Sequence, residues 1–500
     1  MKKLSNILIL VSLILLSVIT IKHFSLSSYV TKYFTQNNET NEVVKTNTPK
    51  KIKTKISYKT HIEKGDLRFQ NGYNTLAITE YTLASQLEPS LPEAYIKIGK
   101  VHFSEKNFQK ALENFRIASQ IDMEDIEAKI LIGIAYINLN EFDKADKILN
   151  SVTGDDARLY YYRGLLNILY KKYDDAKYNL EKAIEADQGN NIKENAQKIL
   201  SAFETFEKSE GAQETYRRTL LSKALSEVNE HNLTIQVIYD VLEENPEYRD
   251  SWIILGYSYL NLEKYFDAIS SFEKALKIDP SKPETLYFLG LVQKKQGEYG
   301  KAINNLEVAI RNGFEPKATA FKELAESYLK NEEYEKSVDY YEKLIIIDPS
   351  NLDAFTKAIW IYIDFIGNPG KAEALAENAV KTHPEDALSY NLLGWTKTIQ
   401  GDMAGAKDNL DKALEIDENL AAAYLNLGIW YEAQENIIEA KANYKRAYEL
   451  EKGTGVGEKA LNLYNAIIKN EISSDQSQSG LYTLLCHSLY SSLEPGSVVS

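Results

Sequence analysis

Residues 249–280 decide the fold and read RDSWIILGYSYLNLEKYFDAISSFEKALKIDP. Apolar residues recur at intervals of three and four within this stretch, which is the spacing of one face of an α-helix. The polar segment Asn261–Lys264 separates two such faces, so the stretch predicts two amphipathic helices joined by a turn. Pro280 follows the second helix and is expected to end it, because proline has no backbone N–H to continue a helix.

Small residues occupy the positions where the two predicted helices would face each other. Gly256 lies in the first helix and Ala268 in the second, where the periodic pattern would admit large apolar residues. Their small side chains would let the two backbones approach closely, while Trp252 and Phe272 fill the flanks. A single pair of helices cannot bury both of its faces, so further copies are expected to stack on it.

This pattern resembles the signature of the tetratricopeptide repeat, a unit of about 34 residues. The residues that carry the resemblance are Trp252, Leu255, Gly256, Tyr259, Ala268, Phe272, Ala275 and Pro280. The resemblance implies an all-α fold in which helix-turn-helix repeats stack into a right-handed superhelical solenoid. It also implies a concave groove lined by the first helix of each repeat.

The sequence predicts two arrays of such units. Gly65, Gly99 and Gly133 are 34 residues apart and mark a first array at residues 58–190. A second array, which ends in a capping helix, is predicted at residues 215–470. The spacing therefore extends the repeat over most of the chain.

Two stretches depart from the repeat pattern. Residues 191–214 have helical apolar spacing but lack the small contact residues, which indicates a joining helix between the arrays. A single eroded repeat is the alternative for this stretch. Within the second array, the repeat pattern that includes Ala372 places Trp360 where glycine is expected, and so bulky a residue there predicts two locally splayed helices.

The two ends of the chain are predicted to differ from the repeats. Residues 1–24 begin with Lys2 and Lys3 and continue as an uncharged apolar run, which is typical of a membrane anchor or a signal segment. A retained single-pass anchor with the repeats outside the cytoplasm is favoured, and secretion after signal cleavage is the alternative. Residues 25–57 are predicted to be a polar, basic linker and residues 471–500 a disordered tail.

The composition excludes several classes of function. The 500-residue chain has a formal net charge of −14 at pH 7, whereas a nucleic-acid binder needs a basic face. Cys486 is the one cysteine, so neither an internal disulfide nor a cysteine-based metal site can form. The glycine-rich segment 453–459 fails the phosphate-binding pattern, because Glu458 stands where the second glycine belongs. No catalytic residue, metal site or cofactor is predicted, and the chain is not expected to be an enzyme.

A partner-binding groove is expected on the side of each first helix that does not face the second helix. The candidate groove residues are Ile130, Ile134, Ile137, Tyr161, Leu165, Ile168, Ile253, Tyr257, Tyr287, Leu291, Asn391 and Trp395. An apolar groove with tyrosines suits a peptide segment or an amphipathic helix. The alternative is that tight superhelical packing buries these residues against one another. Some members of the family that the pattern resembles bind a C-terminal carboxylate with Lys and Asn at set groove positions. Here Ile253, Tyr257 and Phe288 occupy those positions, so this binding mode is not supported.

These features favour a non-enzymatic scaffold or adaptor that assembles other proteins at a membrane or cell envelope. The alternative is a regulatory or substrate-recruiting arm of a separate enzyme system, such as polysaccharide or glycosyl-transfer machinery. The expected partners are a protein or peptide in the groove and a membrane at the N-terminal helix. Nucleic acid is not an expected partner.

Overall fold

The computed structural model describes residues 57–189 and 192–474, with side chains up to Lys469. These residues form 24 α-helices and one π-helix and contain no strand, which confirms the predicted all-helical solenoid. None of these helices is both long enough and apolar enough to span a membrane. The predicted anchor or signal segment, residues 1–24, lies outside the described residues, as do the linker up to residue 56 and the tail beyond residue 474.

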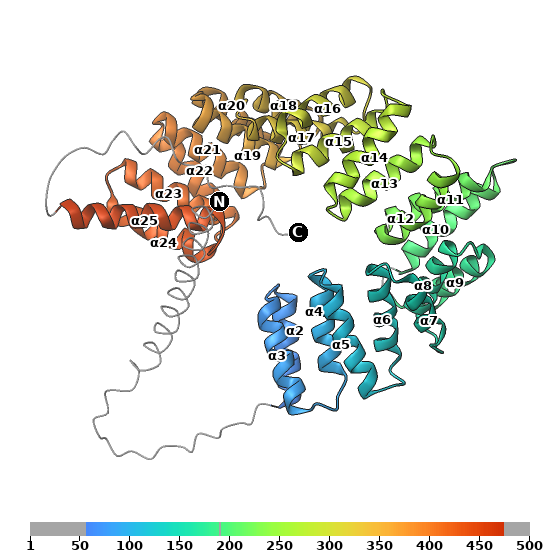
Figure 1. The fold of residues 1–500 in the computed structure, drawn as a ribbon. Helices are drawn as coiled ribbons and strands as arrows, with labels where there is room; N and C mark the ends of the chain where they lie inside the picture. Colours follow the sequence, from blue (N-terminus) through green and yellow to red (C-terminus); the bar gives the residue numbers. More distant parts are fainter. Residues whose placement is uncertain (1–56, 190–191, 475–500) are drawn as a thin grey trace, which may run out of the picture. The chain divides into compact units, whose positions relative to one another are not determined.

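The helices follow one another as pairs, and in Figure 1 each lies beside the next one along the chain. The first array contains α2 (Tyr58–Gln70), α3 (Asn74–Leu87), α4 (Glu93–Ser104), α5 (Phe108–Ile121), α6 (Ile126–Asn138), α7 (Phe142–Asn150), α8 (Ala157–Leu169) and α9 (Tyr173–Ala186). We call the first helix of a pair helix A and the second helix B. The joining stretch holds α10 (Ile192–Glu207).

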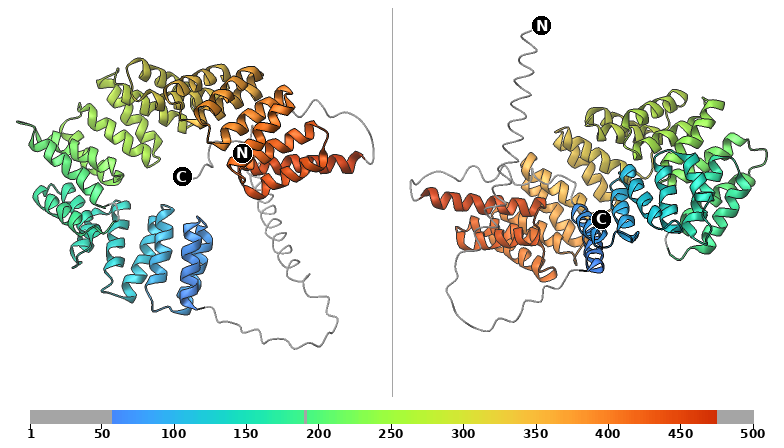
Figure 2. Two further views of the ribbon diagram at one scale, coloured as in Figure 1. Left: turned by 180° about the vertical axis from the view of Figure 1, so that it is seen from behind. Right: turned by 60° about the horizontal axis from the view of Figure 1, so that its bottom comes forward.

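The second array continues the same alternation of helices A and B, and the two further views in Figure 2 show the same neighbours. Its helices are α11 (Glu214–Glu227), α12 (His231–Glu244), α13 (Arg249–Asn261), α14 (Tyr265–Ile278), α15 (Pro283–Lys295), α16 (Tyr299–Arg311), α17 (Lys317–Lys330), α18 (Tyr334–Ile347), α19 (Leu352–Ile361), η1 (Tyr362–Ile366), α20 (Pro369–Thr382), α21 (Ala387–Gln400), α22 (Met403–Ile416), α23 (Ala421–Ala433) and α24 (Ile437–Leu450). The last helix, α25 (Gly455–Ser474), extends four residues into the stretch that was expected to be a disordered tail.

One contact recurs inside the helix pairs, between a glycine on helix A and a large side chain 16 residues later on helix B. A Cβ atom added to Gly256 would lie 2.6 Å from the ring of Phe272, closer than any real contact allows. The eight pairs are Gly65–Tyr81, Gly99–Phe115, Gly133–Leu149, Gly164–Leu180, Gly256–Phe272, Gly290–Leu306, Gly394–Leu410 and Gly428–Tyr444. All eight large side chains are fully buried, so the glycine provides the space that each one fills.

The unit that contains Trp360 lacks this glycine contact, and in the structure its alignment with the repeat pattern differs from the expected one. The π-helix η1 absorbs one extra residue, because a π turn is wider than an α turn. Tyr362 then donates a 2.6 Å hydrogen bond to Glu342 on the preceding helix B, as Tyr328 donates to Glu307 one unit earlier. In the repeat pattern the contact glycine lies three residues before this tyrosine. Three residues before Tyr362 is Ile359, which is fully buried. By this count Trp360 follows the contact position.

The two arrays pack against each other at α12. This helix contacts α6 and α8 of the first array. The side-chain amide of Asn232 donates to the carbonyl oxygen of Asn138 at 3.3 Å, and the Lys106 ammonium lies 2.8 Å from the Glu263 carboxylate, although the two residues are 157 positions apart. The joining helix α10 thus connects two arrays that also contact each other directly.

Glu230, the residue before α12, lies at this junction. Its carboxyl group accepts a hydrogen bond from Tyr162 on α8, and burial among the packed side chains raises its pKa to about 7. The neighbouring His231 is also buried, which lowers the pKa of its imidazole to about 4. Both shifts favour the neutral form, because desolvation at the junction penalises charge.

The contact glycine predicts a local loss of stability when it is enlarged. Gly256→Leu should lower the free energy of unfolding by about 1–3 kcal/mol, because Phe272 cannot yield without an overpacked core. Hydrogen exchange should show the loss in the second array more than in the first. Gly300→Leu is the matched control, since the space around Gly300 on α16 is open. Equal loss of protection in both arrays would contradict this expectation.

The Glu230 carboxyl predicts a pH-dependent stability. The folded chain holds this proton to higher pH than the unfolded chain does, so stability falls as pH rises from about 4.5 through about 7. Glu230→Gln should remove that fall. Relative to the unaltered protein, the free energy of unfolding of the variant should rise by about 1–2 kcal/mol between pH 4.5 and pH 8, a figure that allows for the partial exposure of Glu230. His231 acts in the opposite direction but is present in both proteins and cancels in the difference. Urea unfolding at several pH values measures the difference in stability between the two proteins. Glu243→Gln alters an exposed carboxyl group and is the control, for which this difference should not depend on pH. A pH-independent difference for Glu230→Gln would refute the assignment.

Candidate functional site

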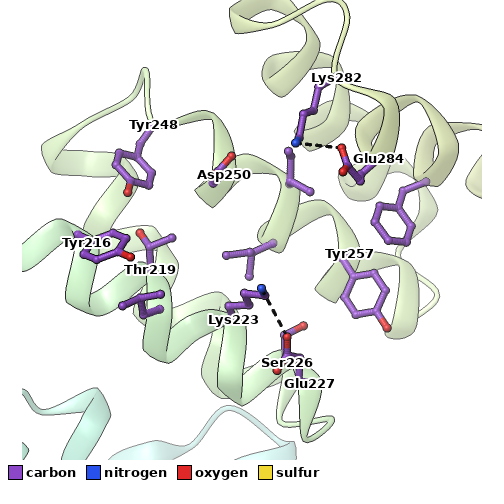
Figure 3. A pocket seen from close by; sticks show the side chains of 14 residues that line it. Tyr216, Thr219, Lys223, Ser226, Glu227, Tyr248, Asp250, Tyr257, Lys282 and Glu284 are labelled. Atoms are coloured by element: carbon purple, nitrogen blue, oxygen red, sulfur yellow. Dashed lines mark ion pairs between the residues drawn. The ribbon is translucent and has the colours of Figure 1, made fainter. Parts of the chain in front are cut away.

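A pocket of about 650 Å³ opens across three successive A helices of the second array, α11, α13 and α15 (Figure 3). Its lining residues are Tyr216, Thr219, Leu220, Lys223, Ser226 and Glu227 from α11, Tyr248, Asp250, Ile253, Ile254 and Tyr257 from α13 and the turn before it, and Lys282, Glu284 and Phe288 from α15 and the turn before it. A volume of this size accommodates several side chains or a small organic molecule.

The pocket is mainly apolar and aromatic. Ile253 and Ile254 come from the central helix, and Phe288 comes from the next helix A. The rings of Tyr257 and Phe288 meet edge to face with centroids 5.2 Å apart, and Tyr257 also approaches the buried His231 ring at 6.0 Å. These ring contacts hold Tyr257 in place while part of its surface remains exposed.

Hydroxyl groups join α11 to α13 beneath the pocket. Thr219 and Ser251 lie within hydrogen-bond distance at 3.2 Å, and the buried Ser226 and Ser258 hydroxyl oxygens are 3.4 Å apart. Small polar residues at these crossing points allow the two helices to approach closely without leaving the hydroxyls unpaired. The helices that frame the pocket are therefore fixed to each other by side-chain contacts.

Ion pairs border the pocket. On α11, Lys223 lies 3.8 Å from Glu227, and beside α15 the Lys282 ammonium lies 3.0 Å from Glu284, as the dashed lines in Figure 3 mark. Asp250 is exposed at the start of α13 and is paired with its neighbour Arg249 at 2.8 Å. The charged residues that line the pocket are thus held in ion pairs.

The predicted groove residues divide into two groups. Three of the twelve are partly exposed: Ile253 and Tyr257, which both line the pocket, and Leu291 on α15. The other nine are buried: Ile130, Ile134, Ile137, Tyr161, Leu165, Ile168, Tyr287, Asn391 and Trp395. These nine offer little surface to a ligand, and at these positions the alternative of mutual burial describes the packing.

Neighbouring helices explain the burial of the first-array residues. Ile137, Tyr161 and Leu165 belong to one hydrophobic cluster with Leu233 and Val237 of α12. One helix of the second array, α12, thus helps to cover α6 and α8 of the first array. The sequence alone could not reveal this contact, because it joins residues that are far apart in the chain.

In the last units, the buried Asn391 and Asn426 bond to each other at 2.9 Å across α21 and α23. Trp395 belongs to a cluster against which Leu463 of α25 packs. The capping helix therefore takes part in covering this end of the array.

Sequence reasoning missed Tyr216 and Tyr248 as pocket residues, and it placed Phe288 at a groove position without proposing it as a binding residue. The repeat period connects these tyrosines to other pocket residues: Tyr216 and Asp250 are 34 residues apart, and so are Tyr248 and Lys282. These positions lie near or just before the start of helix A, whereas the predicted groove residues lie further along the helix. Within the described residues, no group of three or more His, Cys, Asp or Glu side chains is placed to hold a metal ion.

Comparison with known families agrees with this architecture. Models of the tetratricopeptide repeat match residues 102–169, 287–351 and 387–420, and a further model described as TPR repeat matches residues 256–297. The chain thus carries tetratricopeptide repeats at these four stretches. Proteins of this class generally mediate contacts between proteins.

The relatives are partial matches. A TPR repeat-containing protein of Methanocaldococcus jannaschii is 28% identical over 240 residues, which are 44% of this chain and 40% of the relative. A BBSome complex member of Bos taurus is 30% identical over 174 residues, 34% of this chain and 31% of its own length. The peroxisomal targeting signal receptor of Saccharomyces cerevisiae is 23% identical over 241 residues, 45% of this chain and 38% of the receptor. The chain spans less than half the length of each of these relatives.

Two solved structures align over a larger share of the chain, at a lower sequence identity than these relatives. Yeast Tom70 aligns with a TM-score of 0.31 at 17% identity, over 84% of this chain and 97% of that one. The Cut9–Hcn1 complex of the anaphase-promoting complex aligns with a TM-score of 0.33 at 12% identity, over 81% of this chain and 95% of that one.

Two matched substitutions distinguish the buried groove residues from the partly exposed ones. Ile130 and Ile253 hold the same place in their repeats, three residues before the contact glycine, but only Ile253 reaches the pocket. Ile130→Asp should cost about 4 kcal/mol of stability, because it buries an unpaired charge. Ile253→Asp should cost about 1 kcal/mol. Urea unfolding followed by circular dichroism measures both, and equal losses would show that Ile253 is a core residue.

Proposed function

We propose that this chain is a non-enzymatic scaffold that binds a segment of another protein in the pocket between α11, α13 and α15. The observation that carries the proposal is the pocket itself: Ile253 stays partly exposed there while most equivalent positions elsewhere are buried, and the partly exposed Tyr257 and Phe288 line the pocket beside it. Partly exposed apolar and tyrosine side chains in a concave site are typical of surfaces that bind peptides. The names of several relatives agree with such a role, since they describe a receptor and subunits of complexes.

The proposed place of action is a membrane or cell envelope, with the repeats outside the cytoplasm. Support comes from residues 1–24, which combine a basic start with an uncharged apolar run. An anchor there, followed by the polar residues 25–57, would tether the repeats while leaving them free to reach a partner. Secretion after cleavage of the same segment is the alternative.

Site-specific crosslinking in the source cells tests the proposal. A photoreactive amino acid at position 257 should give a defined protein adduct, because Tyr257 lines the pocket. The matched control is position 266 on helix B of the same unit, where Phe266 is 85% exposed but lies outside the pocket. The adduct should be absent at 266, should disappear when Ile253→Asp is added, and should be found in the membrane fraction.

Two results would count against the proposal. If positions 257 and 266 gave the same adducts, binding in the pocket would be refuted. If a pocket-specific adduct were found only in the soluble fraction, the scaffold function would stand and the membrane location would be refuted.

A further inference from the structure

Two helices of this chain already pack over A helices of other units. Leu233 and Val237 of α12 share a hydrophobic cluster with Tyr161 and Leu165 of α8. At the other end of the chain, Leu463 of α25 packs against the cluster that contains Trp360 and Trp395, which both follow a contact position on helix A. In both places the covering element is an amphipathic helix.

The C-terminal example also includes a charge interaction. Lys459 lies four residues before Leu463 and therefore on the same face of α25. Its side chain is nearly buried, with the residue 8% exposed. Burial lowers the pKa of its ammonium to about 8, while the carboxylate of Asp364 in the middle of η1 opposes that shift. Here a covering helix thus brings a cation and an apolar residue to a carboxylate and a tryptophan-containing surface.

The pocket between α11, α13 and α15 presents the same combination of groups and stays open. Within the described part of the chain, Ile253 and Tyr257 remain partly exposed. Phe288 lines the pocket beside them, and Asp250 lies one helical turn before Ile253 on α13. An apolar surface and a carboxylate therefore lie next to each other along a single A helix.

The charges around this carboxylate do not balance. Arg249 is shared, since it lies 2.8 Å from Asp250 and 2.8 Å from Asp279. The other two cations at the pocket, Lys223 and Lys282, are each paired with a glutamate that also lines it. Counted together with Arg249 and Asp279, which do not line the pocket, three cations accompany four carboxylates, an excess of one negative charge.

Asp250 is a carboxylate that a ligand can reach, as are Glu227 and Glu284. Its side chain is 54% exposed, and both contacts from Arg249 are to the same oxygen, Oδ1. Burial raises the pKa of the Tyr248 hydroxyl, and the charge of Asp250 raises it further, so Tyr248 lies near this carboxylate, while Tyr216 lines the same pocket. A carboxylate near an aromatic ring favours a cation, through both charge and the electron-rich ring face.

We infer that the pocket binds an amphipathic helix of a partner protein that carries a basic residue and, three or four positions away on the same face, a large apolar residue. The basic side chain is held at Asp250 near Tyr248, and the apolar side chain packs on Ile253 and Phe288. The inference rests on the proposed function and specifies the chemistry of its partner. The two internal helices that cover other A helices support a helix as the occupant, and the excess of one negative charge supports its basic residue.

Three peptides test this inference on the full-length chain. Each is a capped, fluorescein-labelled, alanine-rich helix of about 15 residues with leucine at one position, a length at which such sequences are partly helical. The peptides differ only at the position four residues before the leucine, which is Lys, Gln or Glu. Fluorescence anisotropy at low salt should give the Lys peptide an affinity about fivefold higher than the Gln peptide, with the Glu peptide weakest.

Two substitutions assign the preference to the pocket. Asp250→Asn should abolish the difference between the Lys and Gln peptides, because it removes the carboxylate and leaves the apolar floor. Glu243→Gln is the matched control, since Glu243 is exposed on α12 outside the pocket, and it should leave the preference unchanged. High salt should reduce the preference in the unaltered chain.

The possible failures are distinct. If Lys and Gln peptides bind equally and Ile253→Asp abolishes both, the inference is overturned while the proposed peptide-binding function stands. A tighter Glu peptide would assign the selection to Lys223 and Lys282 and would also overturn it. If no peptide binds and sedimentation shows self-association that Ile253→Asp removes, the occupant is a second copy of this chain. If no peptide binds and the chain is monomeric, both the inference and the proposed function fail.

Discussion

The contact between a glycine on helix A and a large side chain 16 residues later is the constraint on which the rest of the structure depends. It sets how closely the two helices of a pair approach, and that distance fixes where the opposite face of helix A lies. Because the contact repeats in eight units, one local rule is propagated along the chain. The unit with Ile359 in this place keeps its packing by adding a residue in the π turn, so the rule can be met without glycine.

The sequence predicted the fold well because the information that specifies it is local. Periodicity, small contact residues and proline stops all lie within one unit of about 34 residues. The alignment of the unit with Trp360 shifts by one residue, because counting along the chain cannot tell a π turn from an α turn. It also could not foresee that α25 would continue to Ser474.

The candidate site was harder to predict for the same reason. Position within a repeat identifies which residues point away from helix B, and two residues chosen in this way, Ile253 and Tyr257, line a pocket. It cannot tell whether another part of the chain covers them. Tyr161 and Leu165 have equivalent positions but are buried in a cluster with α12, a contact between distant residues that no local pattern encodes.

The ion pair between Lys106 and Glu263 also bears on the order in which the chain folds. Nearly every other contact in a solenoid is made between near neighbours in sequence, so units can form quickly and independently. Closing a loop of 157 residues in an unfolded chain would cost about 4 kcal/mol in entropy, whereas an exposed ion pair returns about 1 kcal/mol or less. The pair can therefore form only after the intervening repeats have shortened that loop, which makes the junction between the arrays a late event in folding.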